Sequence, residues 1–210
     1  KYQTVALDLP GFGGTQPPPE AWGLEDYADF VDQFIKKTSL KPHAIIGHSY
    51  GGAVAVVSAG RGRGADKLVL LAAAGVRNKR PMRKKLLAAG AKAGKLPLLF
   101  LPAAKRRAVK ARLYGSIGSD IMAVPHMEET FRRIIGEDVR ASANKINIPT
   151  LLIYGSEDKA TPVSDGHILN RSIKGSRLEV IGAGHFLHQD KPERVAKMID
   201  NFLGGSAKDV

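Results

Sequence analysis

Five short apolar runs alternate with helical patterns along this chain, and this alternation restricts the fold more than any other feature. The runs cover residues 4–9, 44–47, 68–72, 150–154 and 178–181. Most of them lack a regular polar alternation, which is typical of strands covered on both faces. Strands separated by helices predict an α/β fold with a doubly wound, mostly parallel sheet and right-handed crossovers.

Helical patterns fill the gaps between the runs. A small-residue helix is predicted at residues 50–59, directly after the second run. The last pattern is the clearest, because Pro192 stands in its first turn and Val195 and Ile199 lie on one apolar face. Asp190 is placed to cap this last helix at its N-terminus.

The positive charge of the chain lies in one segment. The 210 residues carry a net charge of +12, and residues 77–147 hold 17 Lys or Arg against 5 Asp or Glu. This segment also interrupts the alternation of strands and helices. We therefore expect a basic helical cap at residues 77–147, inserted into a core formed by residues 1–76 and 148–210.

The basic residues are densest at residues 77–112, where 13 of them flank the apolar stretch LPLLFLP without a single acid. A solvated lid is the plainest interpretation, since charged runs are usually exposed faces. Such a segment can also seat on an anionic membrane surface, or attract acidic substrates. No aromatic-interleaved nucleic-acid module is visible, so we expect no nucleic acid partner.

The sequence GHSYGG at residues 47–52 stands where an apolar run gives way to a helical pattern. A turn tight enough to lift Ser49 clear of a sheet needs small neighbours, and it places free helix N–H groups beside the hydroxyl. Ser49 is therefore the candidate nucleophile, and the Tyr50 N–H is a candidate oxyanion donor. The bare G-x-S-x-G pattern is weak evidence, but the preceding apolar run and the second glycine strengthen it.

His185 is the candidate base among the six histidines. It follows the last apolar run in the sequence GAGHF, so a glycine turn can present its ring at the carboxyl edge of the sheet, where open α/β folds bind ligands. His48 and Phe186 are candidates for lining the substrate site, and His48 can also buttress it. The remaining histidines have no comparable context and are expected to be structural, namely His43, His126, His167 and His188.

A carboxylate that orients this histidine should follow another strand. Glu157 and Asp158 both follow the run at residues 150–154, and spacing alone does not separate them. Either choice gives the order serine, acid, histidine along the chain. Asp8 precedes Ser49 and is expected to stabilise a turn.

These residue types predict acyl transfer through a serine nucleophile. A serine hydroxyl attacks a carbonyl only when a neutral imidazole takes its proton, and that imidazole needs a buried acceptor. An acyl-enzyme would form on a small acyl substrate and be hydrolysed by water. This chemistry requires no metal and no cofactor. The chain has no cysteine, which excludes a cysteine nucleophile and thiolate metal sites.

These motifs resemble those of the α/β-hydrolase superfamily along essentially the whole chain. LDLPGFGGT is similar to the family's D-x-P-G-x-G loop, GHSYGG to its nucleophile elbow, GSEDKATP to its acid loop, and GAGHF to its histidine loop. The resemblance implies that Asp158, rather than Glu157, is the acid, and that the basic insertion is the family's cap. It implies similarity to capped esterases and lipases, proline iminopeptidases and carbon–carbon bond hydrolases.

The chain departs from the family pattern at its start, where family members have further strands and a His-Gly loop. We therefore expect an N-terminally incomplete sequence that lacks one oxyanion donor, a loss that costs about 10²–10³ in rate. The function expected from the motifs is a serine hydrolase acting on a carboxylic ester or related acyl substrate. The alternative is a hydrolase-like scaffold that binds a small ligand, lipid surface or partner without turnover.

Overall fold

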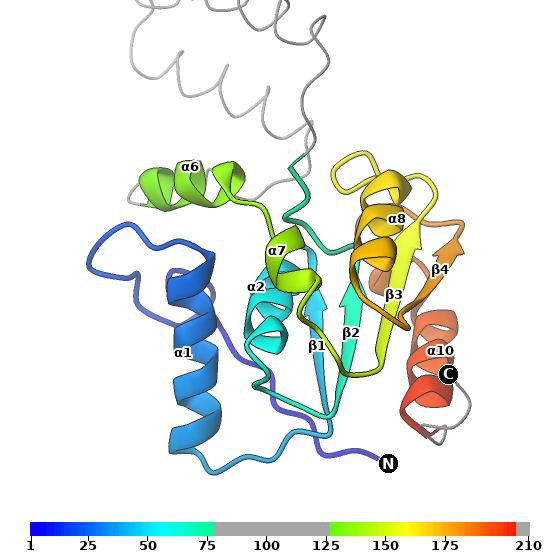
Figure 1. The fold of residues 1–210 in the computed structure, drawn as a ribbon, viewed down its shortest axis with the longest axis horizontal. Helices are drawn as coiled ribbons and strands as arrows, with labels where there is room; N and C mark the ends of the chain where they lie inside the picture. The colour runs from blue at the N-terminus through cyan, green and yellow to red at the C-terminus, as the bar shows by residue number, and fades with distance from the viewer. Residues whose placement is uncertain (78–126, 205–210) are drawn as a thin grey trace, which may run out of the picture.

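A four-stranded parallel sheet organises the structure, which is a computed structural model that describes residues 1–77 and 127–204 (Figure 1). The strands lie in the order β1-β2-β3-β4. Their bounds are Ala44–His48 for β1, Lys67–Leu71 for β2, Thr150–Gly155 for β3 and Arg177–Ile181 for β4. All three neighbouring pairs are parallel, so the carboxyl ends of all four strands share one edge of the sheet.

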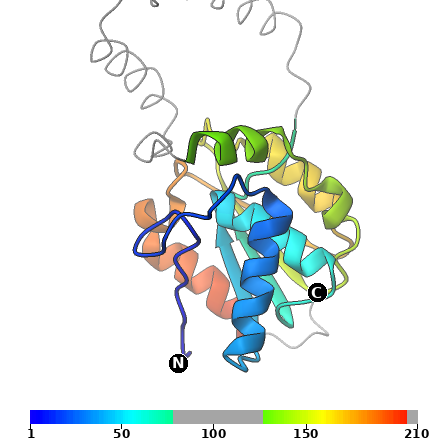
Figure 2. The same ribbon diagram turned by 90° about the vertical axis from the view of Figure 1, so that its left-hand side faces the viewer.

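Helices cover both faces of this sheet (Figures 1 and 2). The helices are α1 (Leu24–Lys37), α2 (Ser49–Gly60), α6 (Glu128–Gly136), α7 (Arg140–Ala143), α8 (Val163–Ser172), α9 (Leu187–Asp190) and α10 (Pro192–Gly204). Alternate residues of β2 enter two different apolar clusters. Leu68 and Leu70 pack on the side of α1, α2 and α8, whereas Val69 and Leu71 pack on the side of α10. The predicted doubly wound α/β fold is thereby confirmed.

The strand predicted at residues 4–9 is wrong. This segment has no strand structure, and Val5 within it is 56% exposed. The residues just before this segment contact α10, where the Tyr2 hydroxyl donates to Asp200 at 2.9 Å. A strand requires a hydrogen-bonding neighbour, and none of the four described strands pairs with this segment. β1 is correspondingly an edge strand of the described sheet, and its Ile46 is 49% exposed.

The predicted cap falls largely outside the described residues, because residues 78–126 are not among them. The lid and membrane-surface interpretations concern residues 77–112, nearly all of which lie outside the described residues. The described end of the segment packs into the same core cluster as the sheet, through Met127, Phe131, Val139 and Ile146. Within residues 1–77 and 127–204, no helix is long and apolar enough to cross a bilayer.

Candidate active site

Ser49 stands on a strained turn between β1 and α2. Its φ of +50° lies in the left-handed region, which residues other than glycine rarely occupy. The strand before it and the helix after it approach closely, since a Cβ on Gly47 would lie 2.6 Å from the carbonyl oxygen of Gly51. This turn lifts the Ser49 side chain to the carboxyl edge of the sheet, as the sequence context predicts.

The two glycines after Ser49 are not equivalent. A Cβ on Gly52 would lie 2.7 Å from the Cβ of Ala73, whereas a Cβ on Gly51 would meet nothing within 4 Å. We expect Gly52→Ala to lower the free energy of unfolding by about 1–3 kcal/mol through overpacking. Gly51→Ala is the matched control and should keep or slightly raise stability, because alanine favours helices by about 1 kcal/mol over glycine. Urea unfolding followed by circular dichroism measures both, and equal losses would contradict the distinction.

Three side chains from separate loops form one hydrogen-bonded chain at this edge. His185 Nε2 lies 2.9 Å from Ser49 Oγ, and His185 Nδ1 lies 2.8 Å from Asp158 Oδ2. Because an ionised carboxylate can only accept, Nδ1 carries the proton that Asp158 binds. Nε2 of the neutral ring is then free to accept the Ser49 proton. These residues follow β1, β3 and β4, whose carboxyl ends meet at one edge of the sheet.

The Asp158 carboxylate is wholly buried and fully hydrogen-bonded. Its Oδ1 accepts from the N–H groups of Ala160 at 2.7 Å and Thr161 at 3.0 Å, and its Oδ2 accepts from the Thr161 hydroxyl at 2.7 Å. Burial alone would raise the pKa of Asp158, but the hydrogen bonds from Thr161, His185 and Ala160 outweigh it and hold the pKa below its usual value. Glu157 is exposed. The structure therefore brings Asp158, and not Glu157, to His185.

His48 supports the loop that carries His185. Its Nε2 lies 2.9 Å from the backbone carbonyl of His185, and because a carbonyl only accepts, Nε2 carries the proton. Burial lowers the pKa of His48 and so favours this neutral form. The His188 ring packs edge-on against the His48 ring, with centroids 4.7 Å apart. The contact with the His185 carbonyl matches the buttressing that the sequence context allowed, and it occupies the His48 Nε2 proton.

Two further candidates lie beside the hydrogen-bonded chain. Phe186 is 40% exposed, and its ring centroid is 5.3 Å from that of His185, so it remains a candidate for contacting substrate. Tyr50 is the second residue of α2, in the first turn, where backbone N–H groups have no partner within the helix. Its side chain turns into an apolar cluster, 5.3 Å from the Tyr27 ring, and burial raises the pKa of its hydroxyl.

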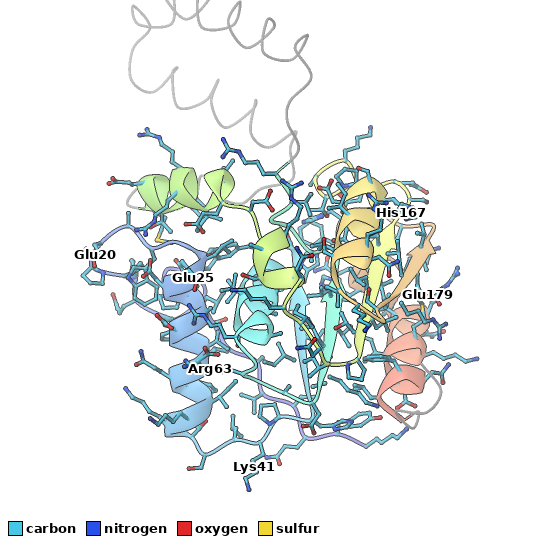
Figure 3. The ribbon with its side chains drawn as sticks, in the orientation of Figure 1. Glu20, Glu25, Lys41, Arg63, His167 and Glu179 are labelled. Carbon is cyan, nitrogen blue, oxygen red and sulfur yellow. The ribbon has the colours of Figure 1, made fainter. Side chains whose placement is uncertain are left out.

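The other residues weighed on sequence lie apart from this chain. The Asp8 carboxylate accepts from the Gly14 N–H at 3.0 Å, so Asp8 stabilises its own turn as expected. His43 and His167 are exposed, and Figure 3 places His167 on α8. His188 packs against His48, while His126 lies outside the described residues. In the part of the chain that the structure describes, no group of three or more His, Asp or Glu side chains could hold a metal ion.

Two residues at the site were missed or misassigned on sequence. Asp190 does not cap α10, because its Oδ2 accepts from the Gly184 N–H at 2.8 Å and thereby holds the turn before His185. Thr161 contacts both Asp158 and His185 through its hydroxyl. The sequence signal for Thr161 was its place in the acid loop, three residues after Asp158, where a side chain can reach back to its own turn.

Comparisons with known proteins show the family to which the chain is similar. A model described as the alpha/beta hydrolase family matches residues 1–198. Monoacylglycerol lipase ABHD6 of Mus musculus is 30% identical over 224 residues, an alignment that covers 95% of this chain and 67% of the lipase.

Solved structures of hydrolases have a similar fold. A hydrolase from Pseudomonas aeruginosa PA01 superposes with a TM-score of 0.69 at 26% identity, covering 94% of this chain and 78% of that one. A membrane phospholipase A, described as a bacterial virulence factor, has a TM-score of 0.69 at 26% identity and covers 94% and 68%.

Proposed function

This chain belongs to the alpha/beta hydrolase family, and on that premise we propose that it is a serine hydrolase that cleaves carboxylic esters through an acyl-enzyme. The observation that carries the proposal is the chain of contacts from Ser49 Oγ to His185 Nε2 and from His185 Nδ1 to Asp158 Oδ2. In the proposal, Ser49 is the nucleophile, His185 the general base and Asp158 the carboxylate that orients the base.

Acylation begins when the Ser49 oxygen attacks the ester carbonyl carbon and His185 Nε2 takes the hydroxyl proton. The carbonyl oxygen becomes an oxyanion, to which the Tyr50 N–H at the start of α2 can donate. The carbon–oxygen bond to the alcohol then breaks, and the alcohol leaves with the proton from His185. An acyl group remains bound to Ser49.

Deacylation repeats the sequence with water. His185 takes a proton from the water molecule, whose oxygen attacks the acyl carbon. The bond to Ser49 then breaks, and the serine oxygen recovers its proton from His185. The buried, ionised Asp158 stabilises the imidazolium that forms in each half of the reaction.

The relatives favour acyl esters of lipids as the substrate class. One relative is named a monoacylglycerol lipase, and one structural neighbour is titled a membrane phospholipase A. We therefore propose an ester with an acyl chain as substrate. The half-exposed Phe186 ring beside His185 supplies an apolar surface on which such a chain can rest.

An activity-directed fluorophosphonate tests the proposal, because an activated serine displaces its fluoride and becomes phosphonylated, whereas ordinary serines do not react. We expect mass spectrometry to find the adduct on Ser49, while Ser58 and Ser156 in the same sample remain unmodified. Protein that has not been treated with the probe should hydrolyse a monoacylglycerol or a p-nitrophenyl ester. A protein that forms no adduct and hydrolyses no ester would instead support the non-catalytic scaffold.

A further inference from the structure

We propose that Thr161 is a positioning residue for the reaction, because its hydroxyl holds the Asp158 carboxylate and the His185 ring in their mutual geometry. This inference rests on the proposed serine hydrolase function and extends it by one residue. Thr161 is itself only 6% exposed, and it contacts no reacting atom. Its effect on the reaction must therefore pass through Asp158 and His185.

The Thr161 hydroxyl oxygen lies at the meeting point of three segments. It is 2.7 Å from Asp158 Oδ2, 3.2 Å from His185 Nδ1 and 3.0 Å from the carbonyl oxygen of Ala72. Ala72 directly follows β2 with a φ of +45°, and its N–H donates to the carbonyl of Ile153 on β3 at 2.9 Å. The hydroxyl thus connects the acid loop, the loop that carries His185 and the residue that follows β2.

A proton count shows what this hydroxyl can do. It has one proton to donate, and its acceptors are Asp158 Oδ2 and the Ala72 carbonyl. His185 Nδ1 already directs its own proton to Asp158, so it does not accept from the hydroxyl. The contact with Asp158 is the shorter one and has a charged acceptor, which makes it the stronger hydrogen bond.

Asp158 Oδ2 therefore accepts from two donors, His185 Nδ1 and Thr161 Oγ1. Two donors on one oxygen restrict rotation of the carboxylate and keep that oxygen facing the imidazole. The hydroxyl also withdraws negative charge from Oδ2. Removing it should leave a carboxylate that is less fixed and more basic, and a more basic carboxylate stabilises the protonated imidazole.

The experiment compares Thr161→Val, which keeps the shape but removes the hydroxyl, with Thr161→Ser, which keeps the hydroxyl. Thr150→Val is the matched control, because it removes another buried threonine hydroxyl. The Thr150 hydroxyl donates to the Ile148 carbonyl at 3.0 Å and makes no hydrogen bond to Ser49, Asp158 or His185. Each variant is measured for kcat and KM, for thermal stability, and for the midpoint of the His185 ring titration by NMR.

We expect Thr161→Val to lower kcat by about 10- to 100-fold with little change in KM. This factor in kcat is the one expected when the transition state loses one buried hydrogen bond. The titration midpoint of the His185 ring in this variant should lie above that of the wild type, because the carboxylate beside it loses a donor. Thr161→Ser should recover most of both quantities. Thr150→Val should lose stability yet keep kcat and the titration midpoint of the wild type.

Two results would overturn the positioning role. One is a Thr161→Val variant whose kcat and His185 titration match those of the wild type. The other is a Thr161→Ser variant as impaired as Thr161→Val, which would indicate packing rather than hydrogen bonding. A wild type without any reactive Ser49 would contradict the proposed function instead, and the NMR titration would still decide whether Thr161 controls His185.

Discussion

Ser49→Ala is expected to lower kcat for ester hydrolysis by about 10⁶-fold, because the substitution removes the atom that forms the acyl-enzyme. The remaining site could only orient a water molecule, with residual help from the helix N–H groups. Ser49 also occupies a strained backbone position at φ +50°, which alanine tolerates no better than serine does. Stability should therefore change little, and kcat measured at saturating ester concentration isolates the chemical loss.

A double variant provides the sharper control for this prediction. Ser49→Ala combined with His185→Ala should be no slower than Ser49→Ala alone, because a base has nothing to activate once the nucleophile is absent. Ser156→Ala, an exposed serine in the loop after β3, should match the wild type. Losses that multiply in the double variant would mean that Ser49 and His185 act independently, against the proposed mechanism.

Ser49 and His185 could be identified on sequence because their signals are local. A serine between an apolar run and a small-residue helix defines its own turn, and a histidine after a strand and two glycines lies at the sheet edge. The parallel order of the strands then fixes which edge both residues share. The structure places Ser49 Oγ and His185 Nε2 2.9 Å apart, although 136 positions separate the two residues in sequence.

The choice between Glu157 and Asp158 could not be made from spacing. The two residues are adjacent, and which one turns inward depends on the path of the loop from Gly155 to Thr161. The structure resolves it through hydrogen bonds: the N–H groups of Ala160 and Thr161 both point at Asp158 Oδ1. Family resemblance selected the same residue, but the physical reason becomes visible only in the folded loop.

The errors on sequence concern contacts between distant segments. Residues 4–9 have the composition of a strand, but strand structure depends on a neighbour that composition does not specify. Asp190 precedes a helix with the residue type of a cap, yet its carboxylate binds the Gly184 N–H before His185. Propensity indicated what each residue can do locally, and tertiary contacts decided which option was realised.

Asp158→Asn is expected to lower kcat by about 10⁴-fold at neutral pH. The asparagine amide can donate to His185 Nδ1, so the ring would carry its proton on Nε2, facing Ser49, where it can no longer accept. The lost negative charge would also leave the imidazolium unstabilised. Steady-state kinetics with the same ester used for Ser49→Ala gives the ratio directly.

Glu157→Gln is the control that gives this ratio its meaning. Both substitutions remove one negative charge, and they do so at adjacent positions, so their long-range electrostatic effects are nearly the same. Only Asp158 touches His185, at 2.8 Å, while Glu157 is exposed to solvent. If the proposal holds, Glu157→Gln keeps kcat within about twofold of the wild type, as is usual for a surface change. Comparable losses in the two variants would assign the effect to the overall charge of the acid loop and would remove Asp158 from its proposed role.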